Sequence, residues 1–223
     1  MWYTVEAYKE ATGVFVIQNL KFRSILDIGR LTLDRPVHCL VGPSGSGKTT
    51  LLRHLNRLNE PDSGQILYRG TDLKTIDPVA LRRKVVMLGQ TPVIYDGTIA
   101  DNLQIGARLA QQTLPGREAM TRALERVGLE QSLDGFCDKL SGGEKQRLCM
   151  ARVMLMEAET YLMDEPSAAL DRETERFMIE NLAGFAGETG RQLILVSHSP
   201  QVAGMFPDGV VALERGRVKE VGA

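Results

Sequence analysis

The stretch Gly42-Pro43-Ser44-Gly45-Ser46-Gly47-Lys48-Thr49 decides the fold, because it matches every fixed position of the pattern G-x-x-x-x-G-K-[ST]. Residues 37–41 before it have the pattern of a short buried strand, and residues 49–58 repeat leucine at helical spacing. In this order, a strand, a glycine-rich loop and a helix N-terminus turn their N–H groups toward phosphate oxygens. We therefore predict a polyphosphate-binding loop rather than a glycine-rich turn that binds nothing.

The loop also supplies two side chains that handle a bound nucleotide. Lys48 is expected to reach the β- and γ-phosphates, and the hydroxyl of Thr49 is expected to take one Mg²⁺ position. The predicted phosphate-binding residues here are Gly42, Pro43, Ser44, Gly45, Ser46, Gly47, Lys48, Thr49 and Thr50.

The composition is that of an ordinary globular protein of 223 residues, with 43% hydrophobic and 25% charged residues. This length suits one domain over residues 1–223, with room for a subdomain. A formal net charge of −1 argues against a broad nucleic-acid-binding surface, so we expect no nucleic-acid partner. Cys39, Cys137 and Cys149 form no C-x-x-C pair, which favours reduced thiols in a cytosolic protein. No apolar run approaches the roughly 20 residues that span a bilayer.

The chain alternates strand and helix patterns, which indicates an α/β protein with a mainly parallel sheet covered on both faces. Residues 1–36 predict a small antiparallel layer ahead of the nucleotide-binding strand. Residues 91–157 predict an inserted helical subdomain. Further strands are expected at 65–70, 85–88, 161–163, 193–196 and, at the sheet edge, 210–213, with helices at 78–83, 140–157 and 173–186.

Two acids close one of the apolar strands, in the run Thr160-Tyr161-Leu162-Met163-Asp164-Glu165. Carboxylates at the carboxyl end of a strand lie at the ligand-binding edge of a parallel sheet. We expect Asp164 to hold Mg²⁺ and Glu165 to polarise an attacking water. Two solvated acids at a strand end are common by themselves, but the phosphate loop favours the site.

The run Leu140-Ser141-Gly142-Gly143-Glu144-Lys145-Gln146-Arg147 is the most informative one after the loop. Ser141 and Glu144 form a capping box, and Gly142 with Gly143 leaves the helix N-terminus open to a phosphate. Capping alone would indicate only a well-capped helix. With this run, however, the chain resembles the ATP-binding-cassette (ABC) family, whose signature motif matches residues 140–147.

The resemblance covers essentially the whole chain, with the motifs in family order. Gln90 is similar to the family's Q-loop glutamine, residues 167–171 to its D-loop and His198 to its switch histidine. The resemblance implies a P-loop NTPase fold and a shared active site. Two such domains, here two copies of this chain, pair head to tail, and each ATP lies between one phosphate loop and the other signature helix.

The resemblance also implies an ATPase that uses ATP and Mg²⁺ and divides the work among specific residues. Loop amides hold the phosphates, a glutamate orients water, a histidine contacts the γ-phosphate, and the partner chain supplies signature residues. The resemblance implies that the catalytic residues are Lys48, Glu165 and His198, and that the Mg²⁺ ligands are Thr49, Gln90 and Asp164. Gln90 also belongs to the ATP-binding residues. The signature residues are Ser141, Gly142, Gly143, Glu144 and Gln146, and Asp171 links the two sites of the pair.

Two positions depart from the family pattern. Where the family stacks an aromatic side chain on adenine, the run Lys21-Phe22-Arg23-Ser24-Ile25 places Ser24. Either Tyr8 or another upstream aromatic residue substitutes, or adenine is held weakly. In addition, Ser199 follows His198 where many members carry an acid.

Because the chain carries no membrane span, transport needs an integral membrane subunit, and the chain is expected in the cytoplasm, peripheral on the inner face of the cell membrane. Val93, Ile94 and Tyr95 either line a docking groove for that subunit or pack inside the helical subdomain.

The cargo is predicted only by analogy. Residues 90–103 resemble the ATPases of a small bacterial group associated with export of iron or other metals, and residues 52–59 resemble phosphate and polar amino-acid importers. We favour export. A non-transport role in cell division, at DNA ends or on ribosomes is the alternative; the DNA-end type usually inserts a long coiled coil, and this chain has no sustained heptads.

Overall fold

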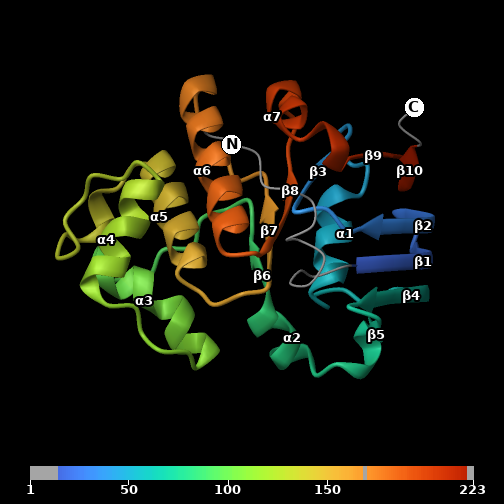
Figure 1. The fold of residues 1–223 in the computed structure, drawn as a ribbon, viewed down its shortest axis with the longest axis horizontal. Coiled ribbons are helices and arrows are strands. Elements are labelled where there is room, and N and C mark those ends of the chain that lie inside the picture. The colour runs from blue at the N-terminus through green and yellow to red at the C-terminus, as the bar shows by residue number, and fades with distance from the viewer. Residues whose placement is uncertain (1–14, 168–169, 220–223) are drawn as a thin grey trace.

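A computed structural model describes residues 15–167 and 170–219 as two sheets and a group of helices (Figure 1). The larger sheet has the strand order β10-β9-β3-β8-β7-β6. Its strands are β3 (Val37–Val41), β6 (Val85–Leu88), β7 (Thr160–Asp164), β8 (Gln192–Val196), β9 (Val210–Glu214) and β10 (Arg217–Lys219). All neighbours pair in parallel except β9 and β10. The predicted α/β class with a mainly parallel sheet is confirmed.

The smaller sheet is antiparallel, with the order β2-β1-β4-β5, and confirms the predicted N-terminal layer from residue 15 onward. Residues 1–14 of that prediction lie outside the described residues. It consists of β1 (Phe15–Phe22), β2 (Leu26–Leu33), β4 (Ser63–Tyr68) and β5 (Thr71–Asp72). The strand expected at 65–70 is therefore β4, which returns to this sheet after the first helix.

Helix α1 (Lys48–Leu55) lies between the two sheets (Figure 1). Its leucines Leu51, Leu52 and Leu55 are fully buried, in one core with side chains such as Phe15 of β1 and Leu162 of β7. Burial on both sides fixes the helix that begins at the phosphate loop.

Strands of the larger sheet alternate their side chains between two cores, as a period of two requires. Leu162 and Ile194 face the α1 core, whereas Tyr161, Met163 and Leu195 face the core formed with the helices. The near-continuous apolar sequences of β7 and β8 therefore reflect burial on both faces.

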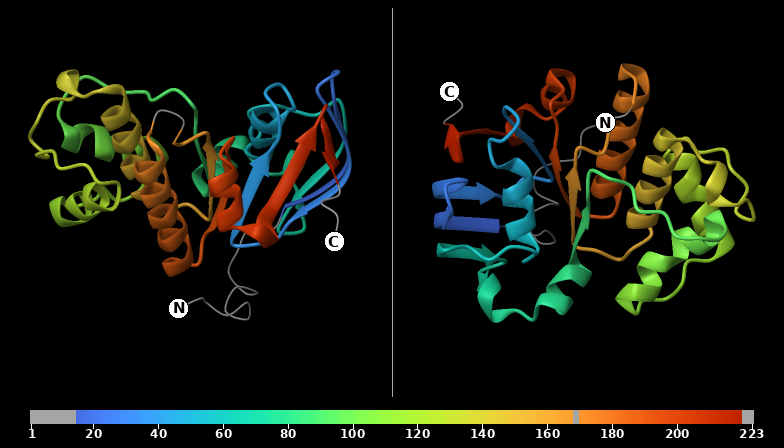
Figure 2. Two further views of the ribbon diagram at one scale, coloured as in Figure 1. Left: turned by 90° about the horizontal axis from the view of Figure 1, so that it is seen from above. Right: turned by 180° about the vertical axis from the view of Figure 1, so that it is seen from behind.

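The remaining helices lie on the side of the larger sheet away from the antiparallel one, except α2 (Figure 2). They are α2 (Pro78–Lys84), α3 (Ile99–Ala110), α4 (Arg117–Arg126), α5 (Gly142–Met154), α6 (Arg172–Glu188) and α7 (Pro200–Met205), with short 3-10 helices at Leu73–Thr75, Cys137–Lys139 and Pro207–Gly209. Within the described residues, no helix combines the length and apolarity needed to cross a bilayer.

Several element bounds and one strand position differ from the sequence predictions. The helix expected at 140–157 begins after the Ser141 cap and ends at Met154. The strand expected at the sheet edge, β9, lies inside the sheet, because β10 pairs outside it. The first helix ends at Leu55 rather than at 58, because Arg57 takes a left-handed backbone conformation with φ 54°.

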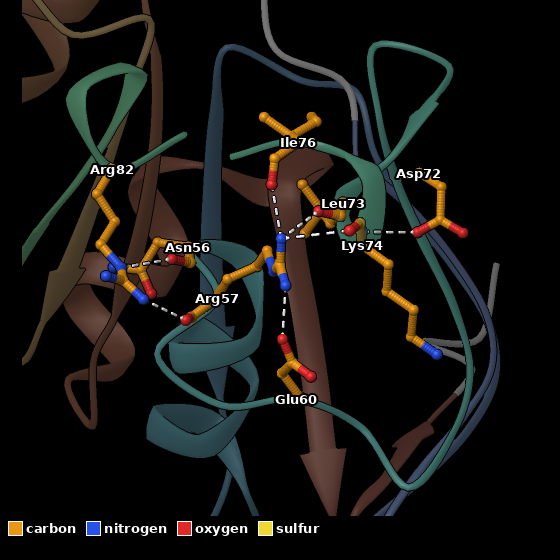
Figure 3. A network of polar contacts seen from close by, with 8 residues as sticks. All are labelled: Asn56, Arg57, Glu60, Asp72, Leu73, Lys74, Ile76 and Arg82. Carbon is orange, nitrogen blue, oxygen red and sulfur yellow. Dashed lines mark hydrogen bonds and ion pairs between the residues drawn. The ribbon is translucent and has the colours of Figure 1, made fainter. Parts of the chain in front are cut away.

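Arg57 anchors the far end of α1 to the antiparallel layer (Figure 3). Its Nη1 donates to the carbonyl oxygens of Leu73 at 3.1 Å and Ile76 at 2.6 Å, and its Nη2 pairs with Glu60 at 2.6 Å. Arg82 in turn donates to the Arg57 carbonyl at 2.7 Å. These contacts fix the position of the C-terminal end of α1. They therefore also fix the direction of the helix axis and of its N-terminus at the phosphate loop.

Replacing Arg57 by methionine should lower the free energy of unfolding by about 1–3 kcal/mol, because partly buried carbonyl groups lose their donor. Chemical denaturation measures this value. Arg108→Met, at an exposed position of α3, serves as the control and should change it by less than about 0.5 kcal/mol. Equal effects of the two substitutions would contradict the anchoring role.

Candidate active site

The loop between β3 and α1 is built for close approach of the backbone. Gly42 has φ 142°, and a Cβ there would lie 2.0 Å from the Leu213 carbonyl oxygen of β9. Only glycine fits this position. Ser46 is buried, and its hydroxyl has no hydrogen-bond partner among the described residues. An unpaired buried hydroxyl within a glycine-rich loop fits a ligand oxygen such as that of a phosphate.

Lys48 is buried at the first position of α1. Its Nζ donates to the carbonyl oxygens of Gly42 at 2.9 Å and Pro43 at 3.0 Å, so the loop curls around the ammonium group. Burial lowers the pKa of Lys48, while the carboxylates of Glu165 and Asp164 act in the opposite direction. The ammonium is therefore positioned for an anion that enters the loop.

Thr49 and Asp164 form the second part of the site. The Thr49 hydroxyl donates to Asp164 Oδ1 at 2.9 Å, and this bond joins the start of α1 to the end of β7. Burial raises the pKa of Asp164, and the hydrogen bond from Thr49 works against that rise. A hydroxyl and a carboxylate beside a phosphate pocket are the oxygen ligands that Mg²⁺ takes together with phosphates. No cluster of three or more His, Cys, Asp or Glu side chains suited to a metal occurs among the described residues.

Glu165 brings together two other predicted residues. Its Oε2 accepts a hydrogen bond from Gln90 Nε2 at 3.0 Å, and its Oε1 lies 3.1 Å from His198 Nε2. These residues follow the adjacent strands β6, β7 and β8. Glu165 has φ 50°, a left-handed conformation that is uncommon for a non-glycine residue and typical of functional positions.

Gln90 donates to Glu165, the residue that follows the predicted Mg²⁺ ligand Asp164. Its own role as a Mg²⁺ ligand stays a prediction. Ser199, which replaces a common acid, caps α7 by accepting from the Val202 N–H. The change therefore preserves the helix cap.

The signature residues lie at an open helix end. Ser141 and Glu144 form the predicted capping box, and the Glu144 carboxylate also accepts from Gln131 at 2.9 Å. These hydrogen bonds, chiefly from Ser141, lower the pKa of Glu144. A Cβ on Gly142 would meet no atom of the described residues within 4 Å, and Ser141 is exposed.

Gln146 and Asp171 differ in their hydrogen bonding within the described residues. Gln146 is buried, and its Nε2 lacks a partner among the described residues. Asp171 caps α6 by accepting from the N–H groups of Glu173 and Thr174. Of the predicted D-loop, residues 168 and 169 lie outside the described residues, while Leu170 Cδ2 would touch a Cβ on Gly143 at 3.6 Å.

The predicted adenine position is open on the described side. Ser24 is exposed in the turn between β1 and β2, and Phe22 packs edge-on against His54 with ring centroids 4.6 Å apart. The Arg23 guanidinium lies over the Phe22 ring. Tyr8, the suggested substitute, lies outside the described residues.

Sequence reasoning missed Arg152 and Asn102, two buried polar residues that link helices α5 and α3. The signal was present: Arg152 is a single charge within the apolar run Leu148-Cys149-Met150-Ala151-Arg152-Val153-Met154. A charge in such a run must find partners when the helix is buried.

Asp164→Asn should raise the melting temperature of the nucleotide-free protein at pH 7. Because the pKa of Asp164 is raised in the folded state, the group favours folding below its ordinary value of 3.8, and this stabilisation is lost as pH rises through the raised pKa. The advantage of the variant should therefore shrink as the pH approaches 3.8. Thermal denaturation across pH measures it.

Asp171→Asn provides a control of opposite sign. Hydrogen bonds from Thr174 lower the pKa of Asp171, so its charge favours folding at neutral pH. This variant should gain no stability at pH 7. A gain as large as that of Asp164→Asn would show that burial of the Asp164 charge is not the cause.

Comparison with known proteins places this geometry in a family. A family model described as "ABC transporter" matches residues 33–168. Protein STAR1 of Oryza sativa subsp. japonica is 41% identical over 186 residues, which cover 82% of this chain and 53% of that protein. The phosphate import ATP-binding protein PstB of Pyrobaculum aerophilum is 39% identical, over 85% of this chain and 80% of the relative.

Comparison with a solved structure leads to the same family. A bacterial Atm1-family ABC exporter with ATP bound superposes with a TM-score of 0.82 at 28% identity, over 95% of this chain and 39% of the exporter chain. The matched part of the chain thus spans 53% of the length of STAR1 and 39% of the length of the exporter chain. Relatives named as ATP-binding proteins imply ATPase activity. By its matched motifs, sequence relatives and fold, the chain belongs to the ABC transporter family.

Proposed function

We propose that this chain is the ATP-binding and ATP-hydrolysing subunit that powers transport through a separate integral membrane subunit. The observation that carries the proposal is the meeting of Gln90, Glu165 and His198 at the ends of three adjacent strands. They lie at the same edge as the bonded pair Thr49 and Asp164. Such convergence at the carboxyl edge of a parallel sheet is what phosphoryl transfer needs.

Each chain residue has a chemical task in this proposal. When ATP binds, the Lys48 ammonium gives up its hydrogen bonds to the loop carbonyls and donates to oxygens of the β- and γ-phosphates instead. The N–H groups of the loop donate to the same phosphate oxygens. Thr49 and Asp164 hold Mg²⁺, which neutralises charge on those phosphates when it is bound. Glu165 accepts a proton from the attacking water, while Gln90 and His198 fix the direction of its carboxylate.

A second copy completes the site in this proposal. The N-terminus of α5 is exposed at Ser141, and a Cβ on Gly142 would meet no atom of the described residues within 4 Å. Its N–H groups are therefore available to a phosphate held by another chain. A head-to-tail pair of copies would place one such helix end over each loop. Catalysis then depends on association, because neither chain alone surrounds the γ-phosphate.

The structure divides the three residues of the suggested docking groove. Val93 and Tyr95 are 58% and 43% exposed, whereas Ile94 packs against the helical core. Ile94 is partly buried rather than enclosed, so its place in the docking groove stays a prediction. Val93 and Tyr95 remain the apolar surface that we propose for the membrane subunit.

Direction and cargo belong to the membrane subunit. The relative PstB is named for phosphate import, and the matched exporter transports in the other sense. We retain metal export as the prediction for cargo, because it rests on residues 90–103. The identity of the membrane chain that co-purifies with this protein tests the prediction for cargo. Capture of only cell-division, DNA-binding or ribosomal proteins would support the non-transport alternative.

Glu165→Gln should reduce ATP turnover on the order of 10²- to 10⁴-fold while ATP binding persists, because the amide keeps the shape but cannot accept the proton. Lys48→Ala should instead weaken ATP binding itself. Phosphate release and nucleotide titration separate the two effects. Normal turnover by Glu165→Gln would remove that residue from the proposed role.

Val93→Lys should abolish co-purification of an integral membrane chain with tagged Glu165→Gln protein, captured with ATP and Mg²⁺ from gently solubilised cells. A desolvated charge at an apolar interface opposes docking. Leu109→Lys, at an exposed apolar position on α3 outside the proposed docking surface, is the matched control and should leave capture intact. Mass spectrometry identifies the partner, and unchanged capture by Val93→Lys would contradict the docking surface.

A further inference from the structure

Arg152 is a buried cation on the last turn of α5, only 9% exposed. Its Nε donates to the Asn102 carbonyl at 2.7 Å, Nη1 to the Val93 carbonyl at 2.8 Å and Nη2 to Asn102 Oδ1 at 2.8 Å. Within the described ranges these acceptors are neutral, and no ion pair to a carboxylate is formed. Burying a cation in this way costs free energy that an apolar side chain would avoid.

The Asn102 side chain extends this contact to the surface segment. It is fully buried, its Nδ2 donates to the Tyr95 carbonyl at 2.8 Å, and its Oδ1 accepts from the Tyr95 N–H at 2.9 Å. The Arg152 guanidinium also lies 5.4 Å from the centroid of the Tyr95 ring. The main chain of residues 93–95 is thereby fixed to α5, while the side chains of Val93 and Tyr95 face outward.

Helix α5 has its other end at the signature residues. Its 13 residues make a rod about 20 Å long, with Ser141 capping one end and Arg152 in the turn at the other. Helix α3 packs closely beside it, because a Cβ on Gly106 of α3 would lie 3.4 Å from Arg152 Cγ. A displacement at one end of this helix is therefore carried to the other rather than absorbed by loose packing.

We propose that Arg152 is the positioning residue that couples nucleotide-dependent closure at the N-terminus of α5 to the apolar surface of Val93 and Tyr95. This inference rests on the proposed function, since it requires ATP to be enclosed against the signature residues. When α5 moves to meet the nucleotide, the three hydrogen bonds of Arg152 move residues 93–95 with it. By linkage, a partner seated on that surface biases closure by the same free energy.

Hydrogen–deuterium exchange of the full chain tests the coupling. In Glu165→Gln protein, addition of ATP and Mg²⁺ should slow exchange in peptides covering 141–147 and in peptides covering 91–98. With Arg152→Met added, the slowing at 141–147 should persist and the ATP-dependent difference at 91–98 should be lost. Arg117→Met, a surface arginine of α4 paired with Asp134, is the control and should keep both differences.

The outcomes separate the inference from the proposed function. Absence of ATP-dependent slowing at 141–147 in the Glu165→Gln protein would count against the proposed function. Persistence of the difference at 91–98 in Arg152→Met would overturn the inference. A purely structural role would raise exchange at 91–98 equally with and without ATP and keep the difference. Should Arg152→Met fail to fold, Arg152→Lys, which keeps the charge but not the fork of donors, should still reduce the difference at 91–98.

Discussion

A buried ammonium group held beside a buried carboxylate is the constraint on which the rest of the structure depends. Lys48 and Asp164 come from the first turn of α1 and the last residue of β7, and the Thr49 hydroxyl ties those two elements together. Keeping such charges out of water is unfavourable, and the loop carbonyls only partly compensate Lys48. The two sheets that enclose α1 supply the apolar burial that holds this arrangement.

The two cores divide the molecule by function. The α1 core carries the phosphate loop, and the other core carries α5 with its open N-terminus and the segment bearing Val93 and Tyr95. Strands β7 and β8 contribute side chains to both cores, so the Asp164, Glu165 and His198 positions lie at the seam between them. A change at the nucleotide can therefore alter the packing of both cores.

Local patterns were sufficient to predict the phosphate loop, the antiparallel layer, the two strand-end acids and the capping box at Ser141, because each depends on residues close in sequence. The meeting of Gln90, Glu165 and His198 could not come from spacing alone, since it depends on β7 lying between β6 and β8. Likewise, the Val93 carbonyl is held by Arg152, which lies 59 residues further along the chain. The anchoring by Arg57 was not predicted because, apart from Glu60, the partners of its guanidinium are main-chain carbonyls, which leave no trace in sequence.

The central claim is that a second copy completes each nucleotide site through its signature helix, and sedimentation velocity tests it most directly. Glu165→Gln protein should be monomeric without nucleotide and dimeric with ATP and Mg²⁺. Adding Gly142→Asp meets no steric obstacle among the described residues and suits a helix N-terminus, but its charge opposes an incoming phosphate. That double variant should bind ATP as a monomer. An ATP-loaded chain that stays monomeric without Gly142→Asp, or one that still dimerises with it, would contradict the account.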